Sequence, residues 1–260
     1  MTGLEAITFD FGNTLVPFPA APMADVLSLT AQRVAGGLAI DRDELVRVWG
    51  EERQRQFAQD VPQGHEADMD VRAVRVLARL RGCPSPEAAG LWDDALAARF
   101  SDRREVAALL DTYATVFVET TPVPPEIGPL LERLARRYAL GILSNWPLAL
   151  AVERFVEAAG WSRNLRAIVI SQRVGVVKPR GEIFSVAAQA LGLASGPAIL
   201  HVGDDVGADV VGAQRAGWRA ALVRVKPADS PLPTAGPARD ANPELAIDSV
   251  LELEAALGLR

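Results

Sequence analysis

The sequence has a single cysteine, almost no lysine and no long apolar run. Because Cys83 is the only cysteine among 260 residues, an intramolecular disulfide and a cysteine-rich metal site are excluded. No stretch of about 18 apolar residues predicts a membrane helix. The N-terminus also lacks a basic segment followed by a long apolar run, which would mark a signal peptide. We therefore expect a soluble, cytoplasmic protein.

The net charge limits which classes of binding partner are expected. The net charge is −6, with 23% charged and 49% hydrophobic residues. A globular chain of this charge is not expected to bind nucleic acid or anionic membranes through its general field. A length of 260 residues accommodates one large domain, or a core domain with a smaller insert. The oligomeric state cannot be predicted from this sequence.

The basic residues are almost all arginine. Of the 27 basic residues, only Lys178 and Lys226 are lysines. Two interpretations stay open. A GC-rich genome could favour arginine codons, in which case the positions of the two remaining lysines are a matter of chance. Alternatively, one of these positions requires a compact ammonium group where a planar guanidinium would not fit.

Short aliphatic runs alternate with helical periodicity in the second half of the chain. Four such runs end just before Asp10, Ser144, Ser171 and Asp204, and their composition is typical of buried strands. A fifth strand is expected at 218–225 and a sixth near 245–247. Helical segments lie between the later strands, at 148–160, 182–192 and 206–217. This alternation predicts an α/β fold with a doubly wound parallel sheet.

The segment 19–120 differs, because it contains no convincing strand. Apolar and charged residues alternate there at helical spacing over four segments: 23–36, 41–60, 66–82 and 86–118. This pattern predicts a helical-bundle domain inserted after the first strand. The α/β core domain would then consist of 1–18 and 121–260. Within the core, the proline-rich segment 226–243 is expected to form a surface loop.

Polar side chains follow the ends of the predicted strands. They are Asp10, Ser144 with Asn145, Lys178, and Asp204 with Asp205 and Asp209. In an open parallel sheet, ligands bind beyond the carboxyl ends of the strands, so these segments can converge on one point. A carboxylate can attack phosphorus, and hydroxyl and ammonium groups can bind the phosphoryl oxygens. Because Mg²⁺ prefers carboxylate and carbonyl oxygens, the set suits metal-assisted phosphoryl transfer.

Four motifs in this order resemble those of the haloacid dehalogenase (HAD) superfamily. They are FDFGNTL at 9–15, LGILSN at 140–145, GVVKPRGEIF at 175–184 and HVGDDVGADVVGAQRAGW at 201–218. The inserted helical segment resembles the α-helical cap of that superfamily. The resemblance implies a Rossmann-like core and a hydrolase, expected to be a phosphatase of a small phosphorylated metabolite.

The resemblance also implies roles for individual residues. Asp10 would be the nucleophile, with Ser144 and Lys178 as its catalytic partners and phosphate ligands. Other substrate contacts would come from Asn13, Thr14 and Asn145. Mg²⁺ would be held by Asp10, the backbone carbonyl of Gly12 and Asp204, with Asp205 or Asp209 supporting the metal. His201 is interpreted as a packed strand-end residue. Trp146 is left open between core packing and substrate contact.

Gly12 departs from the pattern of most HAD phosphatases, which carry a second aspartate at this position. That aspartate protonates the leaving group and then activates water. Glycine keeps the backbone carbonyl but cannot transfer a proton, a contribution of about 10²–10⁴ in rate. We therefore expect a phosphatase that lacks the usual acid, uses another proton donor or favours good leaving groups.

Three alternatives follow from Gly12. The first is a catalytically weak or silent HAD-fold binding protein. The second, less favoured, is a 2-haloacid dehalogenase, because the acidic GDDVGAD segment suits a metal better than a halide. The third is a phosphonate hydrolase, which needs a lysine in its cap. It is nearly excluded, since residues 1–177 contain no lysine.

Overall fold

The computed structural model describes residues 2–87, 90–236 and 241–259. Residues 237–240 of the predicted loop at 226–243 lie outside that part. The chain divides into two compact units. The first, which we call the sheet unit, consists of Met1–Ala20, Pro122–Trp146 and Phe155–Arg260. The second, which we call the helical unit, consists of Ala21–Thr121 with Pro147–Arg154. Residues 147–154 thus group with the helical unit, although the sequence placed them in the core segment. The division into a core and a cap domain stays a prediction.

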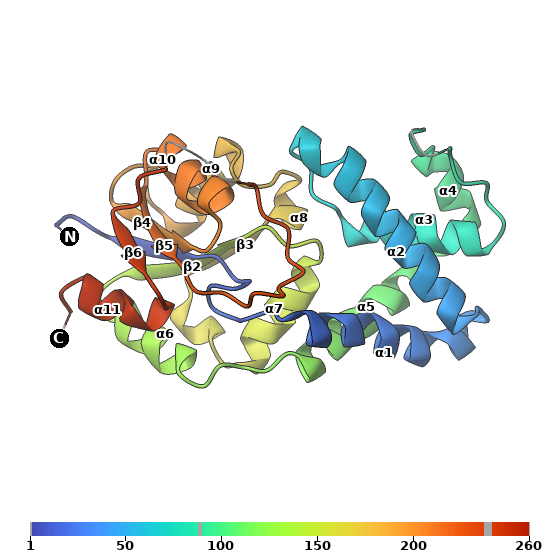
Figure 1. Cartoon of the computed structure of the whole chain (residues 1–260), viewed down its shortest axis with the longest axis horizontal. Helices are drawn as coiled ribbons and strands as arrows, with labels where there is room; N and C mark the ends of the chain where they lie inside the picture. Colours follow the sequence, from blue (N-terminus) through green and yellow to red (C-terminus); the bar gives the residue numbers. More distant parts are fainter. Residues whose placement is uncertain (1, 88–89, 237–240, 260) are drawn as a thin grey trace. The chain divides into compact units, whose positions relative to one another are not determined.

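The sheet unit contains a parallel sheet of six strands in the order β3-β2-β1-β4-β5-β6 (Figure 1). The strands are β1 (Ala6–Phe9), β2 (Ala139–Ser144), β3 (Ala167–Ile170), β4 (Ile199–Gly203), β5 (Arg219–Val223) and β6 (Leu245–Ile247). All adjacent pairs are parallel. This confirms the predicted parallel α/β fold. Such strands are apolar runs because helices cover both faces of the sheet. In Figure 1, α9 and α10 lie on one side and α6 and α11 on the other.

The helices of the sheet unit are α6 (Ile127–Ala135), α7 (Ala149–Ala158, which spans the boundary of the two units), α8 (Ser171–Val174), α9 (Gly181–Leu191), α10 (Gly212–Arg215) and α11 (Leu253–Ala256). Of these, α7 and α9 lie near the predicted segments 148–160 and 182–192, whereas α6 and α8 were not predicted. One prediction needs correction. The segment 206–217 does not form a continuous α-helix, because it opens with a π-helical turn (Val206–Val211) before α10. π-Helical turns are rare and are frequent at functional sites.

The middle of the sheet positions the candidate site. β1 lies between β2 and β4, and Phe9 is in register with Ile142 on one side and Val202 on the other. All four residues of β1 are buried. The residue that follows Phe9 therefore emerges at the carboxyl edge of the sheet between two neighbouring strand ends.

The described residues of 21–121 form five α-helices and a short 3-10 helix (Val61–Gln63), and they include no strand. The helices are α1 (Ala20–Leu38, whose first residue belongs to the sheet unit), α2 (Arg42–Gln59), α3 (Met69–Leu80), α4 (Asp94–Phe100) and α5 (Arg103–Thr120). The predicted helix at 86–118 is wrong in its continuity. It breaks at Ser101, whose backbone is extended, and α5 restarts where the Asp102 side chain accepts a hydrogen bond from the N–H of Arg104 at 2.7 Å.

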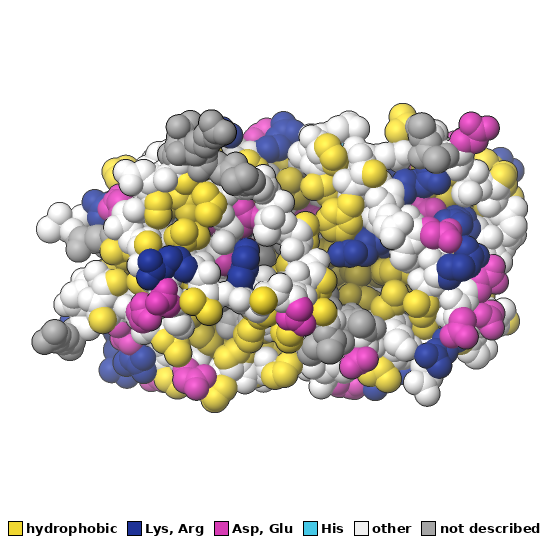
Figure 2. Space-filling model, viewed as in Figure 1, with side chains coloured by type: hydrophobic (Ala, Val, Ile, Leu, Met, Phe, Trp, Pro, Cys, Tyr) yellow, Lys and Arg dark blue, Asp and Glu magenta, His cyan; other side chains and the backbone are white. Residues whose placement is uncertain are grey.

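Charged side chains of both signs lie side by side over the helical unit in Figure 2. Arg47 pairs with Glu51 at 2.6 Å on α2, and Arg79 of α3 pairs with Glu51 at 2.5 Å and with the buried Glu52 at 2.7 Å. These arginines form an ion-paired surface rather than a free basic patch. Among the described residues, no helix combines the length and the apolar composition needed to cross a membrane.

Candidate active site

Asp10 is the first residue beyond the central strand. Its backbone N–H continues the sheet by donating to the carbonyl of Val202 at 2.8 Å. The chain then turns sharply, because Asn13 has a left-handed backbone (φ 58°) and its N–H donates to the carbonyl of Val16 at 2.7 Å. Asparagine tolerates this conformation better than most residues. The strand end and the turn together hold the Asp10 carboxylate, which is 8% exposed.

Lys178 connects Asp10 to two other segments. Its ammonium group donates to Asp10 Oδ1 at 2.7 Å, to Asp209 Oδ1 at 2.6 Å and to the carbonyl of Leu143 at 2.8 Å. The side chain is buried. These three bonds use the three donors of an ammonium group. A guanidinium could not make them from a single point, which favours the interpretation that lysine at 178 is required.

Asp209 lies deeper in the same network. Its Oδ2 accepts from the backbone N–H of Asp205 at 2.9 Å, and its Oδ1 lies 3.1 Å from His201 Nε2. Because Asp209 is ionised it only accepts, so Nε2 of His201 carries the hydrogen. Nδ1 then accepts from the hydroxyl of Thr8 at 2.9 Å. The Asp209 carboxylate passes so close to Gly203 that a Cβ there would lie 2.1 Å from Oδ2. Glycine at 203 is therefore required by this approach.

The charges in this network act against each other. Burial raises the pKa of Asp10 to about 6, and the Lys178 ammonium only partly offsets it. For Asp209, burial also opposes ionisation, but Lys178 and His201 outweigh it and hold the pKa well below its usual range. Burial and the nearby Lys178 charge lower the pKa of His201, which stays neutral. Burial opposes the charge of Lys178 too, yet Asp10 and Asp209 keep its pKa above the usual value. The network therefore holds one firmly ionised carboxylate, Asp209, and one readily protonated carboxylate, Asp10.

Asp204 and Asp205 have different surroundings. The Asp204 carboxylate accepts a hydrogen bond from Lys226 Nζ at 2.8 Å, and burial raises its pKa while Lys226 partly offsets the rise. Asp205 Oδ1 caps the π-helical turn by accepting from the N–H groups of Gly207 at 2.8 Å and Ala208 at 2.9 Å. Its Oδ2 accepts from the N–H of Ala235 at 2.6 Å. Both oxygens of Asp205 thus accept hydrogen bonds from backbone N–H groups. A metal ligand at Asp205 stays a prediction.

Three carboxylates come together at the edge of the sheet. Oxygens of Asp10, Asp204 and Asp209 lie within 4.8 Å of one another. Carboxylates at this spacing offer the oxygen donors that Mg²⁺ prefers. Nearby, at the end of β2, the hydroxyl of Ser144 is buried without a hydrogen-bond partner. A buried hydroxyl left unpaired is typical of a place where a ligand completes the hydrogen bonding.

Two of the other predicted substrate contacts, Asn145 and Asn13, form hydrogen bonds within the protein. The Asn145 amide donates to the carbonyl of Lys178 at 3.0 Å and accepts from its N–H at 2.7 Å. The Asn13 amide donates to Ser230 Oγ at 3.0 Å and accepts from the N–H of Phe18 at 3.1 Å. Both side chains therefore position the loops that carry Lys178 and Asp10. The Thr14 hydroxyl is buried and unpaired.

The place beside Gly12 is apolar. A Cβ at Gly12 would lie 2.6 Å from Cδ1 of Leu232, 3.2 Å from Cζ3 of Trp146 and 3.6 Å from Cδ2 of Phe18. Trp146 is buried and packs on Phe18, with ring centroids 5.1 Å apart. The side-chain position of the usual proton donor is thus bordered by carbon atoms and partly filled by Leu232. Trp146 packs in this core, which was one of its two open interpretations.

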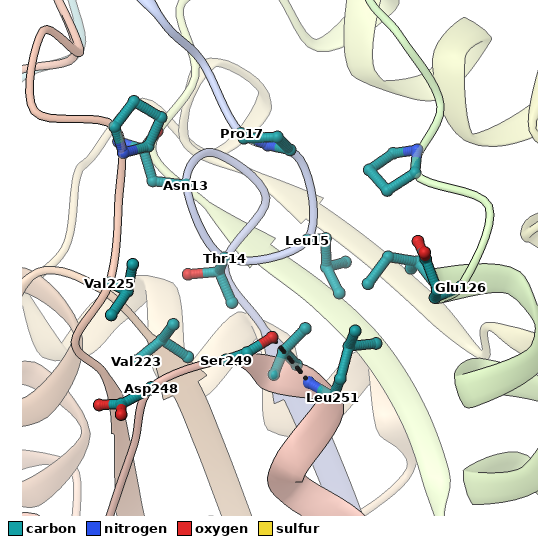
Figure 3. Close-up of a pocket in the computed structure, with 14 residues that line it drawn as sticks. Asn13, Thr14, Leu15, Pro17, Glu126, Val223, Val225, Asp248, Ser249 and Leu251 are labelled. Atoms are coloured by element: carbon teal, nitrogen blue, oxygen red, sulfur yellow. Dashed lines mark hydrogen bonds between the residues drawn. The ribbon is translucent and has the colours of Figure 1, made fainter.

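A small pocket of about 230 Å³ lies against the turn that follows Asp10 (Figure 3). Asn13, Thr14 and Leu15 line it from the turn, and Val223, Val225 and Ser249 line it from the ends of β5 and β6. Its lining, in the part of the chain that the structure describes, does not include the three clustered carboxylates. This pocket is therefore separate from the carboxylate cluster.

Sequence reasoning missed three features of the site. His201 belongs to the network, Lys226 neutralises Asp204, and Leu232 occupies the place beside Gly12. The rarity of lysine was a signal for Lys226, because both lysines of the chain bind the carboxylate cluster. No local pattern marked Leu232.

A family model for haloacid dehalogenase-like hydrolases matches residues 4–217 of this chain. Among curated proteins, a glyceraldehyde 3-phosphate phosphatase of Methanopyrus kandleri is 26% identical over 226 residues, which cover 85% of this chain and 84% of that protein. A phosphoserine phosphatase of Thermus thermophilus is 38% identical over 103 residues, covering 39% of this chain and 41% of that protein.

Solved structures share the fold over the whole chain. A 2-haloacid dehalogenase of Pseudomonas syringae superposes with a TM-score of 0.65 at 22% identity, and the match covers 98% of both chains. Identity at this level shows a common fold and does not separate dehalogenase from phosphatase chemistry.

Proposed function

The chain belongs to the haloacid dehalogenase-like hydrolases, and from that premise we propose that it is a Mg²⁺-dependent phosphatase acting on small phosphorylated metabolites. The observation that carries the proposal is the cluster of Asp10, Asp204 and Asp209 beside the ammonium of Lys178, in which Asp209 is buried. A halide leaving group needs no metal, whereas three carboxylates suit a divalent cation. The phosphatase names of the curated relatives support the same class of reaction.

Asp10 is the proposed nucleophile. Lys178 binds its Oδ1, which leaves Oδ2 as the oxygen not engaged by that ammonium. Attack of this oxygen on phosphorus forms an aspartyl phosphate and breaks the bond from phosphorus to the leaving oxygen. Water then hydrolyses the aspartyl phosphate, which releases phosphate and restores the carboxylate. Lys178 holds the carboxylate in place, and the unpaired Ser144 hydroxyl is available to donate to a phosphoryl oxygen.

The proposed metal ligands are Asp10, Asp204 and Asp209, with the backbone carbonyl of Gly12. The chemistry that Mg²⁺ supplies when bound is neutralisation of the repulsion between a carboxylate and a phosphate. The carboxylate oxygens of these three residues, within 4.8 Å of one another, fit that ion. The Asp209 oxygens are already hydrogen-bonded to Lys178, His201 and the N–H of Asp205, so Asp209 is the most constrained of the three.

The lack of an acid side chain at position 12 affects the expected rates of both steps, departure of the leaving group and hydrolysis of the aspartyl phosphate. Gly12 has no side chain to act as the acid, and the three described atoms nearest to a Cβ there are carbon atoms of Leu232, Trp146 and Phe18. Leaving groups that depart without a proton, such as nitrophenolate, are therefore favoured over alkoxides. Hydrolysis of the aspartyl phosphate also lacks the usual base, so this step is slow and the phosphorylated protein accumulates. A burst of leaving group followed by slow turnover is the expected time course.

The test uses the purified full chain with p-nitrophenyl phosphate, with Mg²⁺ or with chelator. We expect a Mg²⁺-dependent burst, and borohydride reduction during turnover should convert Asp10 to homoserine, identified by peptide mass. The Asp10→Asn variant should show neither signal. A panel of metabolite phosphates then identifies the substrate. Absence of phosphate release across the panel would refute the phosphatase, and chelator-insensitive chloride release from a 2-chloro acid would replace it by a dehalogenase.

One observation favours a second candidate, a catalytically weak binding protein. The three atoms nearest to a Cβ placed at Gly12, where the usual proton donor begins, are carbon atoms of Leu232, Trp146 and Phe18. For such a protein, a phosphorylated ligand would bind without being hydrolysed. Calorimetry with the same panel separates the two candidates, because it detects binding in samples that release no phosphate.

A further inference from the structure

Both lysines of the chain contact the same group of carboxylates. Lys178 binds Asp10 and Asp209, and Lys226 binds Asp204 with its Nζ 2.8 Å from Oδ2. All three carboxylates of the cluster thus have an ammonium partner, in a chain whose other basic residues are arginines. The two lysines differ in burial, since the side chain of Lys178 is 1% exposed and that of Lys226 is 32% exposed. Lys178 is therefore fixed, whereas Lys226 reaches the cluster from a position open to solvent.

Lys226 begins a segment that crosses the strand ends, which we call the crossing loop (residues 226–236). Four further contacts fix it to the candidate site or next to it. Asp229 accepts from the N–H of Ala20 at 3.2 Å, and Ser230 binds the Asn13 amide at 3.0 Å. Leu232 fills the place beside Gly12, and the N–H of Ala235 donates to Asp205. The loop stays attached through these contacts when the bond of Lys226 is broken.

The Asp204 carboxylate is 9% exposed and carries a charge that needs a partner at this burial. The ammonium of Lys226, 2.8 Å from Oδ2 of Asp204, is such a partner. A divalent cation bound by Asp10, Asp204 and Asp209 would supply the same neutralisation and would repel the ammonium from the shared carboxylate. The two cations therefore compete for Asp204.

This inference rests on the proposed metal site. We propose that Lys226 is a tethered counterion of that site, which holds Asp204 while the metal is absent and leaves it when a divalent cation binds. Its flexible four-carbon stem and its solvent-facing position allow the ammonium to move into water without breaking the rest of the crossing loop. Lys178, which is buried and bound to three oxygens, stays in place.

The low number of lysines makes a direct test possible. Protein grown with lysine labelled by ¹³C at Cε should give two lysine signals, which the Lys226→Arg variant assigns. On titration with Mg²⁺ alone, the Lys226 signal should move to the position of a solvated lysine, while the Lys178 signal keeps its buried value. An unchanged Lys226 signal in protein that calorimetry shows to be Mg²⁺-bound would overturn the inference.

Calorimetric affinity for Mg²⁺ gives a second, independent readout without substrate. Lys226→Met should bind Mg²⁺ on the order of tenfold more tightly, because the competitor is removed. Lys226→Arg should stay near the native affinity. The matched control is Arg224→Met, which removes one positive charge two residues away from an exposed pair with Asp248 and should change the affinity less than about twofold.

If Lys226→Met and Arg224→Met increase the Mg²⁺ affinity equally, the increase comes from the change in net charge alone, and the inference is overturned. Failure of the native protein to bind Mg²⁺ at all would instead overturn the proposed metal site, and the tethered counterion with it. Circular dichroism and melting in chelator verify that each variant is folded before it is titrated.

Discussion

Replacing Asp10 by asparagine is expected to stabilise the metal-free protein, although it removes the proposed nucleophile. Burial raises the pKa of Asp10 from 3.8 to about 6 despite the Lys178 ammonium. The folded state therefore binds this proton more tightly than the unfolded chain does. At about 1.4 kcal/mol for each of roughly two pKa units, ionisation of Asp10 opposes folding by about 3 kcal/mol at neutral pH. Asparagine removes this penalty and still offers an oxygen to Lys178.

The sign of the effect fixes its pH dependence. Below pH 3.8, Asp10 is protonated in both states and its ionisation contributes nothing; the penalty grows as pH rises from 3.8 to about 6 and is complete above it. The advantage of Asp10→Asn should therefore be small near the lower limit and full at neutral pH. In calorimetric melts with chelator, it should raise Tm by roughly 5–10 °C at neutral pH.

Asp209→Asn is the matched control, because Asp209 binds the same ammonium as Asp10. Although burial opposes its ionisation, Lys178 and His201 hold the pKa of Asp209 well below its usual range, so its charge favours folding. Removing that charge should destabilise the protein by about 3 kcal/mol, as for other broken buried pairs. If both variants lower Tm by a similar amount, Lys178 fully offsets the burial cost of the ionised Asp10 carboxylate without a metal. That result would refute the opposite effects expected for Asp10 and Asp209.

Three further substitutions test single contacts. Ser144→Ala should change Tm by less than about 1 °C, because the serine hydroxyl has no hydrogen-bond partner to lose. The same variant should raise KM for aryl phosphates severalfold. An unchanged KM would show that Ser144 does not contact the substrate. Gly12→Asp alone should lower Tm, because its Cβ would lie 2.6 Å from Leu232. The double variant Gly12→Asp/Leu232→Ala should recover Tm and raise turnover of alkyl phosphates by up to about 10²-fold. A lower turnover in a folded double variant would show that the glycine serves another purpose. Asn145→Ala should lower kcat about tenfold with KM little changed, because it removes both hydrogen bonds to the Lys178 backbone. Steady-state kinetics measures both constants, and a change in KM with kcat unchanged would contradict this expectation.

The sequence alone predicted the sheet and the positions at its edge. Short aliphatic runs alternating with helices indicate parallel strands, and the residue after each run must emerge at the same edge. For this reason Asp10, Ser144 and Asp204 could be placed together before any coordinates, with Lys178 on the segment that follows the third run. Local patterns are sufficient here because both the strand and its end are encoded within a few consecutive residues.

Features decided by segments distant in sequence could not be predicted in this way. Asp205 and Asp209 are equally plausible in the sequence, and only the cap of the π-helical turn and the approach to Gly203 separate them. Lys226 and Leu232 reach the site because the crossing loop folds back over strand ends whose motifs lie up to about 220 residues earlier in the chain. Which charge meets Asp204, and what fills the space beside Gly12, depend on that packing. Only the tertiary structure could decide them, because no periodicity or spacing along the chain records which side chains meet across such a distance.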